Sequence, residues 1–105
     1  MTYTIIVLPQ AKRDAGDIDA YLAERNPAAA DRFVRNLQAT LELQASIPTP
    51  GMPWLSENPA LAQIRWTRVK GFENYLVFLR ISGSLMEVVR ILHGARDLEA
   101  ILSGQ

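Results

Sequence analysis

Apolar residues in the first half of the chain recur at the spacing of amphipathic helices. Between Gln10 and Arg25 they fall at steps of four, three and four, at Ala11, Ala15, Ile18 and Leu22. Residues spaced in this way share one stripe of a helix, so this segment is predicted to be helical, with the stripe turned towards a core. The carboxylates of this segment are expected on the other, solvent-facing side; they belong to Asp14, Asp17 and Asp19.

A second helix is predicted from about residue 27 to residue 46. Its apolar stripe consists of Ala30, Phe33, Val34, Leu37 and Leu41. Asn26 is a favourable N-cap, and Pro27 has the backbone angle of a first helical residue. Because almost no chain separates the two helices, they must fold back on each other as a hairpin.

Four segments have the composition of β-strands. They are rich in β-branched and aromatic residues and are bounded by Pro, Gly, Asn or Ser. These segments are residues 3–8, 62–69, 75–81 and 85–92. The last two are predicted to pair as a hairpin through Ser82, Gly83 and Ser84.

The order of these elements predicts the fold class. Residues 48–59 hold four of the six prolines and are expected to form a loop, pinned by Trp54 and Leu55. Residues 97–102 are predicted to form a short final helix. The pattern β-α-α-β-β-β predicts a two-layer α+β fold, in which an antiparallel sheet packs on the helical hairpin. The length of 105 residues predicts one domain over 1–105.

The two strands of the predicted hairpin are apolar on both faces except for single charges such as Arg80 and Arg90. One helical layer can cover only one face of the sheet. The other face is therefore expected to expose Leu, Val or Met side chains beside these arginines. An exposed apolar face of this kind indicates a partner protein.

Composition narrows the function classes. The chain has no cysteine and one histidine, so neither a disulfide framework nor a metal site is expected. No Gly-rich phosphate loop is present, and no cofactor is expected. The chain lacks a run of about 18 apolar residues and a secretory signal at its start, which predicts a cytoplasmic protein. Eleven basic and eleven acidic residues give zero net charge, so sequence-specific binding of nucleic acid by this chain alone is not expected.

His93 is the only histidine, and two interpretations of it stay open. Its near-neutral pKa suits a general acid or base, and strand arginines could stabilise a phosphorane-like transition state in a metal-free ribonuclease. Alternatively, His93 is a cap at the strand end, where it hydrogen-bonds to the backbone or to Asp97. A lone histidine without identified partners favours the second interpretation.

Several segments, taken in their order along the chain, resemble ParE-type toxins of the ParE/RelE toxin–antitoxin superfamily. The resemblance spans nearly the whole chain, and no single segment carries it alone. It is clearest in Ile64-Arg65, in Val69-Lys70-Gly71-Phe72, in Tyr75–Arg80, and in Arg90-Ile91-Leu92-His93-Gly94-Ala95-Arg96-Asp97.

The resemblance implies a RelE-like fold and the toxin half of a type II toxin–antitoxin pair. ParE-like toxins are known chiefly as non-enzymatic inhibitors of DNA gyrase, and a ParD-like antitoxin neutralises them in a hetero-oligomeric complex. RelE-like toxins instead cut mRNA with a cluster of basic residues and often a C-terminal tyrosine. Here the last tyrosine is Tyr75 and only two lysines occur, which favours the ParE branch. Leu79 stands where ParE toxins usually have an aromatic residue, so an inactive antitoxin-binding homologue is a third alternative.

Candidate site residues follow from the predicted strands and from the resemblance. Contacts with the target are expected from Arg80, Arg90, His93 and Arg96. Contacts with the antitoxin are expected from Tyr21, Trp66, Leu79 and Met86. If the chain is a ribonuclease, the catalytic residues are expected to be Arg65, Arg80 and His93.

Overall fold

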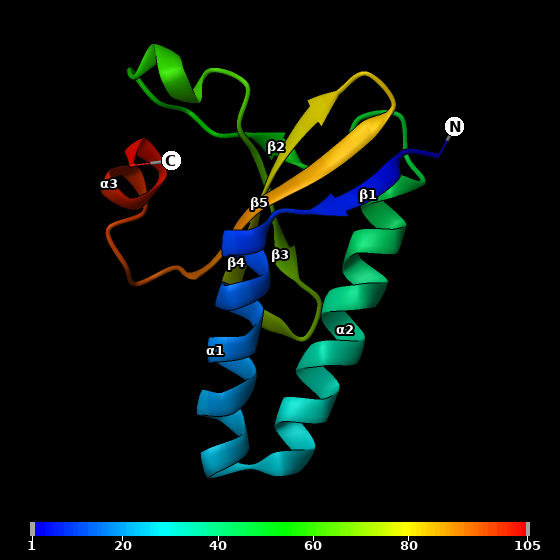
Figure 1. The fold of residues 1–105 in the computed structure, drawn as a ribbon, viewed down its shortest axis with the longest axis vertical. Helices are drawn as coiled ribbons and strands as arrows, with labels where there is room; N and C mark the ends of the chain where they lie inside the picture. The colour runs from blue at the N-terminus through cyan, green and yellow to red at the C-terminus, as the bar shows by residue number, and fades with distance from the viewer. Residues whose placement is uncertain (1, 105) are drawn as a thin grey trace.

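The computed structural model describes residues 2–104. Its centre is a five-stranded sheet with the strand order β1-β5-β4-β3-β2 (Figure 1). The strands are β1 (Thr4–Val7), β2 (Met52–Pro53), β3 (Arg65–Val69), β4 (Phe72–Ser82) and β5 (Leu85–His93). The α+β class predicted from the sequence is confirmed.

The sheet differs from the expected one in two respects. β1 pairs with β5 in parallel, whereas every other neighbouring pair is antiparallel, so the sheet is mixed. Strand composition does not reveal the direction of the partner, which explains this error. In addition, β2 lies inside the segment expected to be a loop. A proline is tolerated there because β2 is an edge strand.

The predicted helical hairpin is present. It consists of α1 (Pro9–Arg25) and α2 (Pro27–Ala45), and each begins with proline. The side chain of Asn26 accepts a hydrogen bond from the Ala29 backbone N–H at 3.2 Å, as expected of an N-cap. Of the helices within residues 2–104, none combines the length and the apolar character that a membrane span needs.

A short helix, α3 (Leu98–Ser103), follows the sheet. Its N-cap is Asp97, whose side chain accepts a hydrogen bond from the Ala100 N–H at 3.3 Å. Residues 59–61 form a 3₁₀ turn, η1 (Pro59–Leu61), before β3. These two small elements lie next to each other in the fold.

The helical hairpin covers one face of the sheet. Phe33 of α2 lies edge-on to the rings of Phe72 and Tyr75, with centroids 5.4 Å away in both cases. The buried side chains around it include Ala11, Leu41, Val69, Val77, Leu79, Met86, Val88 and Ile91. Burial of each large apolar side chain contributes about 1.5–3 kcal/mol, so this cluster is the main core.

The opposite face of the sheet is covered as well, and the expectation of an open apolar face is wrong. The segment before β3 and α3 fold over it and bury a second cluster of Leu61, Ile64, Leu76, Phe78, Val89, Leu92 and Leu102. Trp54 packs edge-on against Phe78 at 5.4 Å, and its Nε1–H donates to Glu99 Oε1 at 3.1 Å. The apolar side chains on both faces of these strands are therefore buried by other parts of the same chain.

A β-bulge in β5 changes which residues face the helices. In the register with β4, Arg90 lies opposite Phe78 and Val88 lies opposite Leu79, so Val89 is the extra residue. Val88 and Ile91 consequently both join the helix-side cluster although they are three positions apart. The bulge lies just beyond the last residue of β5 that is paired with β1, and this position shapes the candidate site.

Candidate functional site

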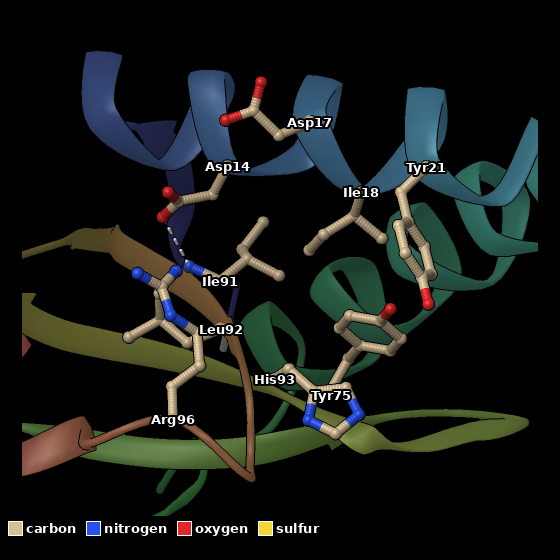
Figure 2. Close-up of a pocket in the computed structure, with 9 residues that line it drawn as sticks. All are labelled: Asp14, Asp17, Ile18, Tyr21, Tyr75, Ile91, Leu92, His93 and Arg96. Carbon is tan, nitrogen blue, oxygen red and sulfur yellow. Dashed lines mark hydrogen bonds between the residues drawn. The ribbon is translucent and has the colours of Figure 1, made fainter.

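The candidate site is a cavity of about 370 Å³ between α1 and the end of β5 (Figure 2). Helix α1 forms one side, and the ends of β4 and β5 with the loop that follows form the other. The lining residues are Asp14, Asp17, Ile18, Tyr21, Tyr75, Ile91, Leu92, His93 and Arg96. A volume of this size lies within the range of protein pockets that hold small ligands or inserted side chains.

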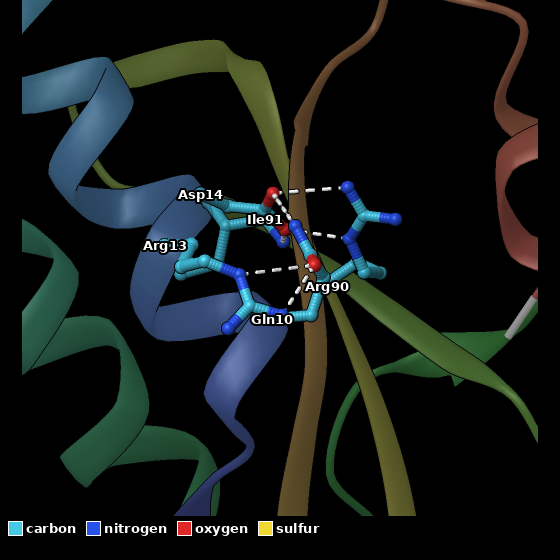
Figure 3. Close-up of polar contacts among 5 residues, drawn as sticks. All are labelled: Gln10, Arg13, Asp14, Arg90 and Ile91. Carbon is cyan, nitrogen blue, oxygen red and sulfur yellow. Dashed lines mark hydrogen bonds and ion pairs between the residues drawn. The ribbon is translucent and has the colours of Figure 1, made fainter.

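A buried ion pair joins the two sides of the cavity. Arg90 Nε donates to Asp14 Oδ2 at 2.7 Å, and Arg90 Nη2 donates to Asp14 Oδ1 at 2.9 Å (Figure 3). Asp14 also accepts from the Ile91 backbone N–H at 3.0 Å and from Gln10 Nε2 at 3.3 Å. Burial alone raises the pKa of Asp14, but these hydrogen bonds outweigh it and hold that pKa below its ordinary value.

The position of Asp14 follows from the shortness of β1. The last backbone hydrogen bond on this side of β5 runs from the Leu8 N–H to the Val88 carbonyl. Beyond it, the outer edge of β5 has no neighbouring strand, and the Asp14 carboxylate accepts the Ile91 N–H in place of a strand carbonyl. A buried backbone donor without a partner would be costly, so Asp14 completes the sheet edge.

Aromatic side chains form the end of the cavity that lies away from Asp14. The Tyr75 and His93 rings meet edge-on with centroids 5.1 Å apart, and the Arg25 guanidinium lies 3.8 Å from the Tyr21 ring centroid. Burial raises the pKa of Tyr75; nearby Tyr21 raises it further, and Arg25 acts in the opposite direction. Tyr75 is therefore a neutral phenol near pH 7 and can donate a hydrogen bond.

His93 has one ring nitrogen already engaged. Its Nδ1 accepts a hydrogen bond from the Ala95 backbone N–H at 3.0 Å, which closes the turn after β5. A neutral imidazole that accepts at Nδ1 carries its hydrogen at Nε2. The interpretation of His93 as a cap of the strand end is thus confirmed, and its free Nε2–H is a donor.

The residues expected for a ribonuclease do not meet at one site. Arg65 donates to the Pro50 carbonyl at 2.6 Å and to the Gly51 carbonyl at 3.0 Å, where it anchors the loop before β3. Arg80 pairs with Glu87 at 2.8 Å. His93 lies opposite Tyr75 on β4, five positions from Arg80, which corresponds to about 17 Å along a strand.

The residues expected to contact the target are divided between different environments. Arg90 is buried in its ion pair, so the expectation that it lies on an open face is wrong. The Arg80 side chain is 41% exposed on the sheet. His93 and the exposed Arg96 both line the cavity.

The residues expected to contact the antitoxin are also divided. Tyr21 is 51% exposed and lines the cavity, whereas Trp66 is half-buried beneath the Arg68 guanidinium, 5.1 Å from its ring centroid. Leu79 and Met86 are fully buried in the main core. Their side chains are not accessible in this fold, so these two expectations are corrected.

Asp14 is a further residue whose placement the sequence predicts wrongly. It was expected at the surface, yet it is 6% exposed. A signal was present, because Ala11, Asp14 and Ile18 have the i, i+3, i+7 spacing of one helix face. The role of Tyr75 in the cavity was also missed, since it depends on the register of β4 with β5.

The candidate site combines hydrogen-bond donors with apolar walls. Within residues 2–104, no cluster of three or more His, Cys, Asp or Glu side chains could hold a metal ion. Each buried side-chain nitrogen or oxygen in this part of the chain has a hydrogen-bond partner. The fold and cavity thus define a small α+β protein suited to binding another molecule.

Comparison with known proteins identifies the family. Residues 5–98 match the family model of the ParE toxin of the type II toxin–antitoxin system parDE. The chain therefore belongs to the ParE toxin family and is a type II toxin–antitoxin toxin of the ParE/RelE superfamily.

Individual relatives agree with this assignment. The chain is 35% identical over 94 residues to Toxin RelE1 of Caulobacter vibrioides, a match that covers 90% of this chain and 96% of that protein. It also resembles a chain in the structure of a chromosomal ParDE toxin–antitoxin system from P. aeruginosa, with a TM-score of 0.71. That match has 16% identity and covers 88% of this chain and 96% of the other, so it shows a shared fold.

Proposed function

We propose that this toxin acts by binding a protein target, DNA gyrase, without catalysing a reaction itself. A ParD-like antitoxin neutralises it in a hetero-oligomeric complex in the cytoplasm, where gyrase works. The family match over residues 5–98 supports the toxin–antitoxin part of this proposal. Gyrase is the target implied by the resemblance to ParE.

One observation carries the non-enzymatic part of the proposal: the three residues expected to cut RNA, Arg65, Arg80 and His93, do not meet at one place. Arg65 and Arg80 are engaged with loop carbonyls and with Glu87, respectively. Catalysis of RNA cleavage requires an acid or base and a positive charge around one phosphate. A separation of about 17 Å between Arg80 and His93 does not meet that requirement.

The hydrogen bonding of His93 supports the same proposal. A general base needs a free lone pair on a ring nitrogen, and here the Nδ1 lone pair accepts the Ala95 N–H. When Nδ1 accepts this hydrogen bond, Nε2 is the nitrogen that carries a hydrogen. His93 could act as a base only after the turn at Ala95 had opened.

Arg80 is proposed as a contact to the target. Its side chain is 41% exposed, and its partner Glu87 is 20% exposed. Exposed ion pairs contribute about 0–1 kcal/mol to stability, so the guanidinium can exchange Glu87 for a target carboxylate at low cost. We expect Arg80→Ala to reduce toxicity while leaving the fold intact, and Arg35→Ala on α2 is the matched control.

An mRNA endonuclease is the second candidate, and one observation favours it. The relative with 35% identity is called Toxin RelE1. RelE-type toxins cut mRNA on the ribosome. The cavity would then have to supply catalysis through His93 and Arg96, because Arg65 and Arg80 lie elsewhere.

The deciding experiment expresses the chain in bacteria without an antitoxin. We expect filamentation, an SOS response and, with purified gyrase and supercoiled plasmid, trapped DNA cleavage complexes. Rapid arrest of translation with cut mRNA and no cleavage complexes would overturn the proposal in favour of the endonuclease. Normal growth at high expression would instead identify an inactive antitoxin-binding homologue.

A further inference from the structure

Hydrogen-bond donors dominate the polar lining of the cavity between α1 and β5. They are the Tyr21 and Tyr75 hydroxyls, the His93 Nε2–H and the Arg96 guanidinium. Figure 2 shows the two tyrosines and His93 grouped at one end, while Arg96 extends along the wall below Asp14 and Ile91.

The carboxylates at the cavity do not balance these donors. Asp14 accepts four hydrogen bonds, from Arg90 twice, from Ile91 and from Gln10. Its charge is neutralised by Arg90. Asp17 also lines the cavity but is exposed, and in Figure 2 its carboxylate points away from Arg96 and His93. Among the lining residues, all within 2–104, the cavity therefore offers one cationic group without an ion-pair partner, Arg96, and several neutral donors.

The remaining walls are apolar. Ile18, Ile91 and Leu92 line the cavity together with the ring faces of the tyrosines. A free phosphate would gain nothing from these walls, and a strand of nucleic acid could use only the tyrosine rings, for base stacking. An acidic side chain with apolar neighbours on the same peptide would satisfy both the donors and the apolar surface.

We propose that this cavity receives an acidic side chain, Asp or Glu, flanked by apolar residues in the antitoxin. The inference rests on the proposed function, because it assumes an antitoxin partner. The carboxylate accepts from Arg96, while the adjacent residues of the same peptide contact Ile18, the tyrosine rings and the His93 Nε2–H at the other end of the cavity. Charge-assisted hydrogen bonds of this kind are stronger than neutral ones and define the orientation of the peptide.

The test uses the purified protein encoded by the reading frame that adjoins the toxin gene. Its affinity for the wild-type chain and for variants is measured by isothermal titration calorimetry at two salt concentrations. Arg96→Glu is expected to weaken binding by about tenfold or more, since it replaces a charge-assisted hydrogen bond by repulsion. The matched control Arg35→Glu carries the same charge change at an exposed position on α2, outside the cavity lining, and is expected to bind as wild type does.

A double-mutant cycle identifies the carboxylate. Each Asp or Glu in the C-terminal half of the adjoining protein is changed singly to Asn or Gln. One of these changes is expected to weaken binding to the wild-type chain about tenfold and, because it removes the like-charge repulsion, to strengthen binding to Arg96→Glu. Tyr75→Phe, which removes one hydroxyl and preserves the ring, is a second variant with an expected smaller loss of affinity.

The outcomes separate this inference from the proposed function. If the adjoining protein binds wild type, Arg96→Glu and Tyr75→Phe equally well, the cavity assignment is wrong while the antitoxin proposal stands. Absence of coupling between Arg96 and any carboxylate of the partner contradicts the assignment as well. If the adjoining protein does not bind the wild-type chain, the antitoxin proposal fails and this inference fails with it. Binding of a labelled single-stranded RNA that Arg96→Glu abolishes would overturn it in favour of a nucleic-acid site.

Discussion

Asp14 and Arg90 are 76 positions apart in the chain, yet two hydrogen bonds of 2.7 and 2.9 Å join their side chains in a forked ion pair (Figure 3). Both side chains are less than a tenth exposed. The pair connects the first helix to the edge of β5 at the point where β1 has ended. It therefore holds together the two walls of the candidate binding cavity.

The first prediction concerns the stability that depends on this pair. Removing one member of a buried ion pair leaves the other charge buried and unpaired, which costs about 3–5 kcal/mol. Arg90→Met is expected to lower the free energy of unfolding by about this amount, measured by urea denaturation. Adding Asp14→Asn to Arg90→Met is expected to restore part of the loss, because the asparagine is neutral and its side-chain oxygen still accepts the Ile91 N–H.

The double-mutant cycle gives a clear criterion. Coupling of at least about 1 kcal/mol between the two substitutions is expected for residues in direct contact. Additive effects, each below about 1 kcal/mol, would show that the pair is solvated in solution. The result also bears on toxicity experiments, since a loss of toxicity in Arg90→Ala could arise from unfolding.

The second prediction is the response of stability to acid. The pKa of Asp14 in the folded protein lies below its ordinary value, so the unfolded chain binds this proton more readily. The stabilisation is therefore fully present above the unfolded value of about 3.9 and is lost as the pH falls through the folded value. The difference in unfolding free energy between wild type and Asp14→Asn is expected to shrink steadily below about pH 4.

Urea denaturation between pH 7 and pH 2 measures this effect. The control is Asp31→Asn, which removes an exposed carboxylate on α2. Its difference from wild type is expected to stay small throughout. A constant difference between wild type and Asp14→Asn over the whole range would contradict the assignment of Asp14 as the acid-sensitive group.

Local signals predicted most elements of this fold. The helical hairpin follows from the apolar stripes and from Asn26-Pro27, whose capping role depends on the neighbouring backbone alone. The turn at Gly83 and the hairpin of β4 with β5 also follow from nearby residues. In contrast, the parallel direction of β1 and the covering of the second sheet face depend on contacts between distant segments.

Trp54 illustrates why the covered face could not be predicted. The sequence indicates that Trp54 and Leu55 pin the proline-rich loop; Trp54 does so, whereas Leu55 is 89% exposed and does not. The partners of Trp54, however, are Phe78 and Glu99, which lie 24 and 45 positions further along the chain. Loop composition predicts the absence of helix but does not specify the path of the chain, so it cannot show that this segment covers the second face of the sheet.

The same limit applies to the candidate site. His93 and Arg96 are close in sequence, and both were predicted to be functional. Their relation to Tyr21 depends on how α1 packs against β5, which is determined by Asp14 and Arg90. In the sequence, the one indication of that packing is an acidic residue, Asp14, on the same helix face as the apolar residues Ala11 and Ile18.

The third prediction tests whether α3 seals the second face of the sheet. Leu102 is 1% exposed and packs in that cluster. Truncation of a buried leucine costs about 2–5 kcal/mol, so Leu102→Ala is expected to lower the free energy of unfolding by that amount. Leu55→Ala is the matched control at 89% exposure, with an expected change within about 0.5 kcal/mol. If both variants unfold at the same urea concentration as wild type, α3 does not cover the sheet in solution.

The fourth prediction compares two glycines in similar backbone conformations. Gly51 has φ of +64° and Gly83 has φ of +60°, so alanine is strained at both by about 1–2 kcal/mol. At Gly51 an added Cβ would also lie 2.8 Å from the Trp66 carbonyl oxygen, whereas at Gly83 it would meet no atom within 4 Å beyond the glycine's two chain neighbours. The Gly51 backbone cannot shift easily, because its N–H donates to Gln44 Oε1 at 2.6 Å and its carbonyl accepts from Arg65.

Gly51→Ala is therefore expected to lower the free energy of unfolding by at least about 1 kcal/mol more than Gly83→Ala, measured by thermal and urea denaturation. Equal effects of the two substitutions would contradict this prediction. They would mean that the backbone before β2 can shift away from Trp66, and that the hydrogen bonds of Arg65 to the Pro50 and Gly51 carbonyls can break at low cost.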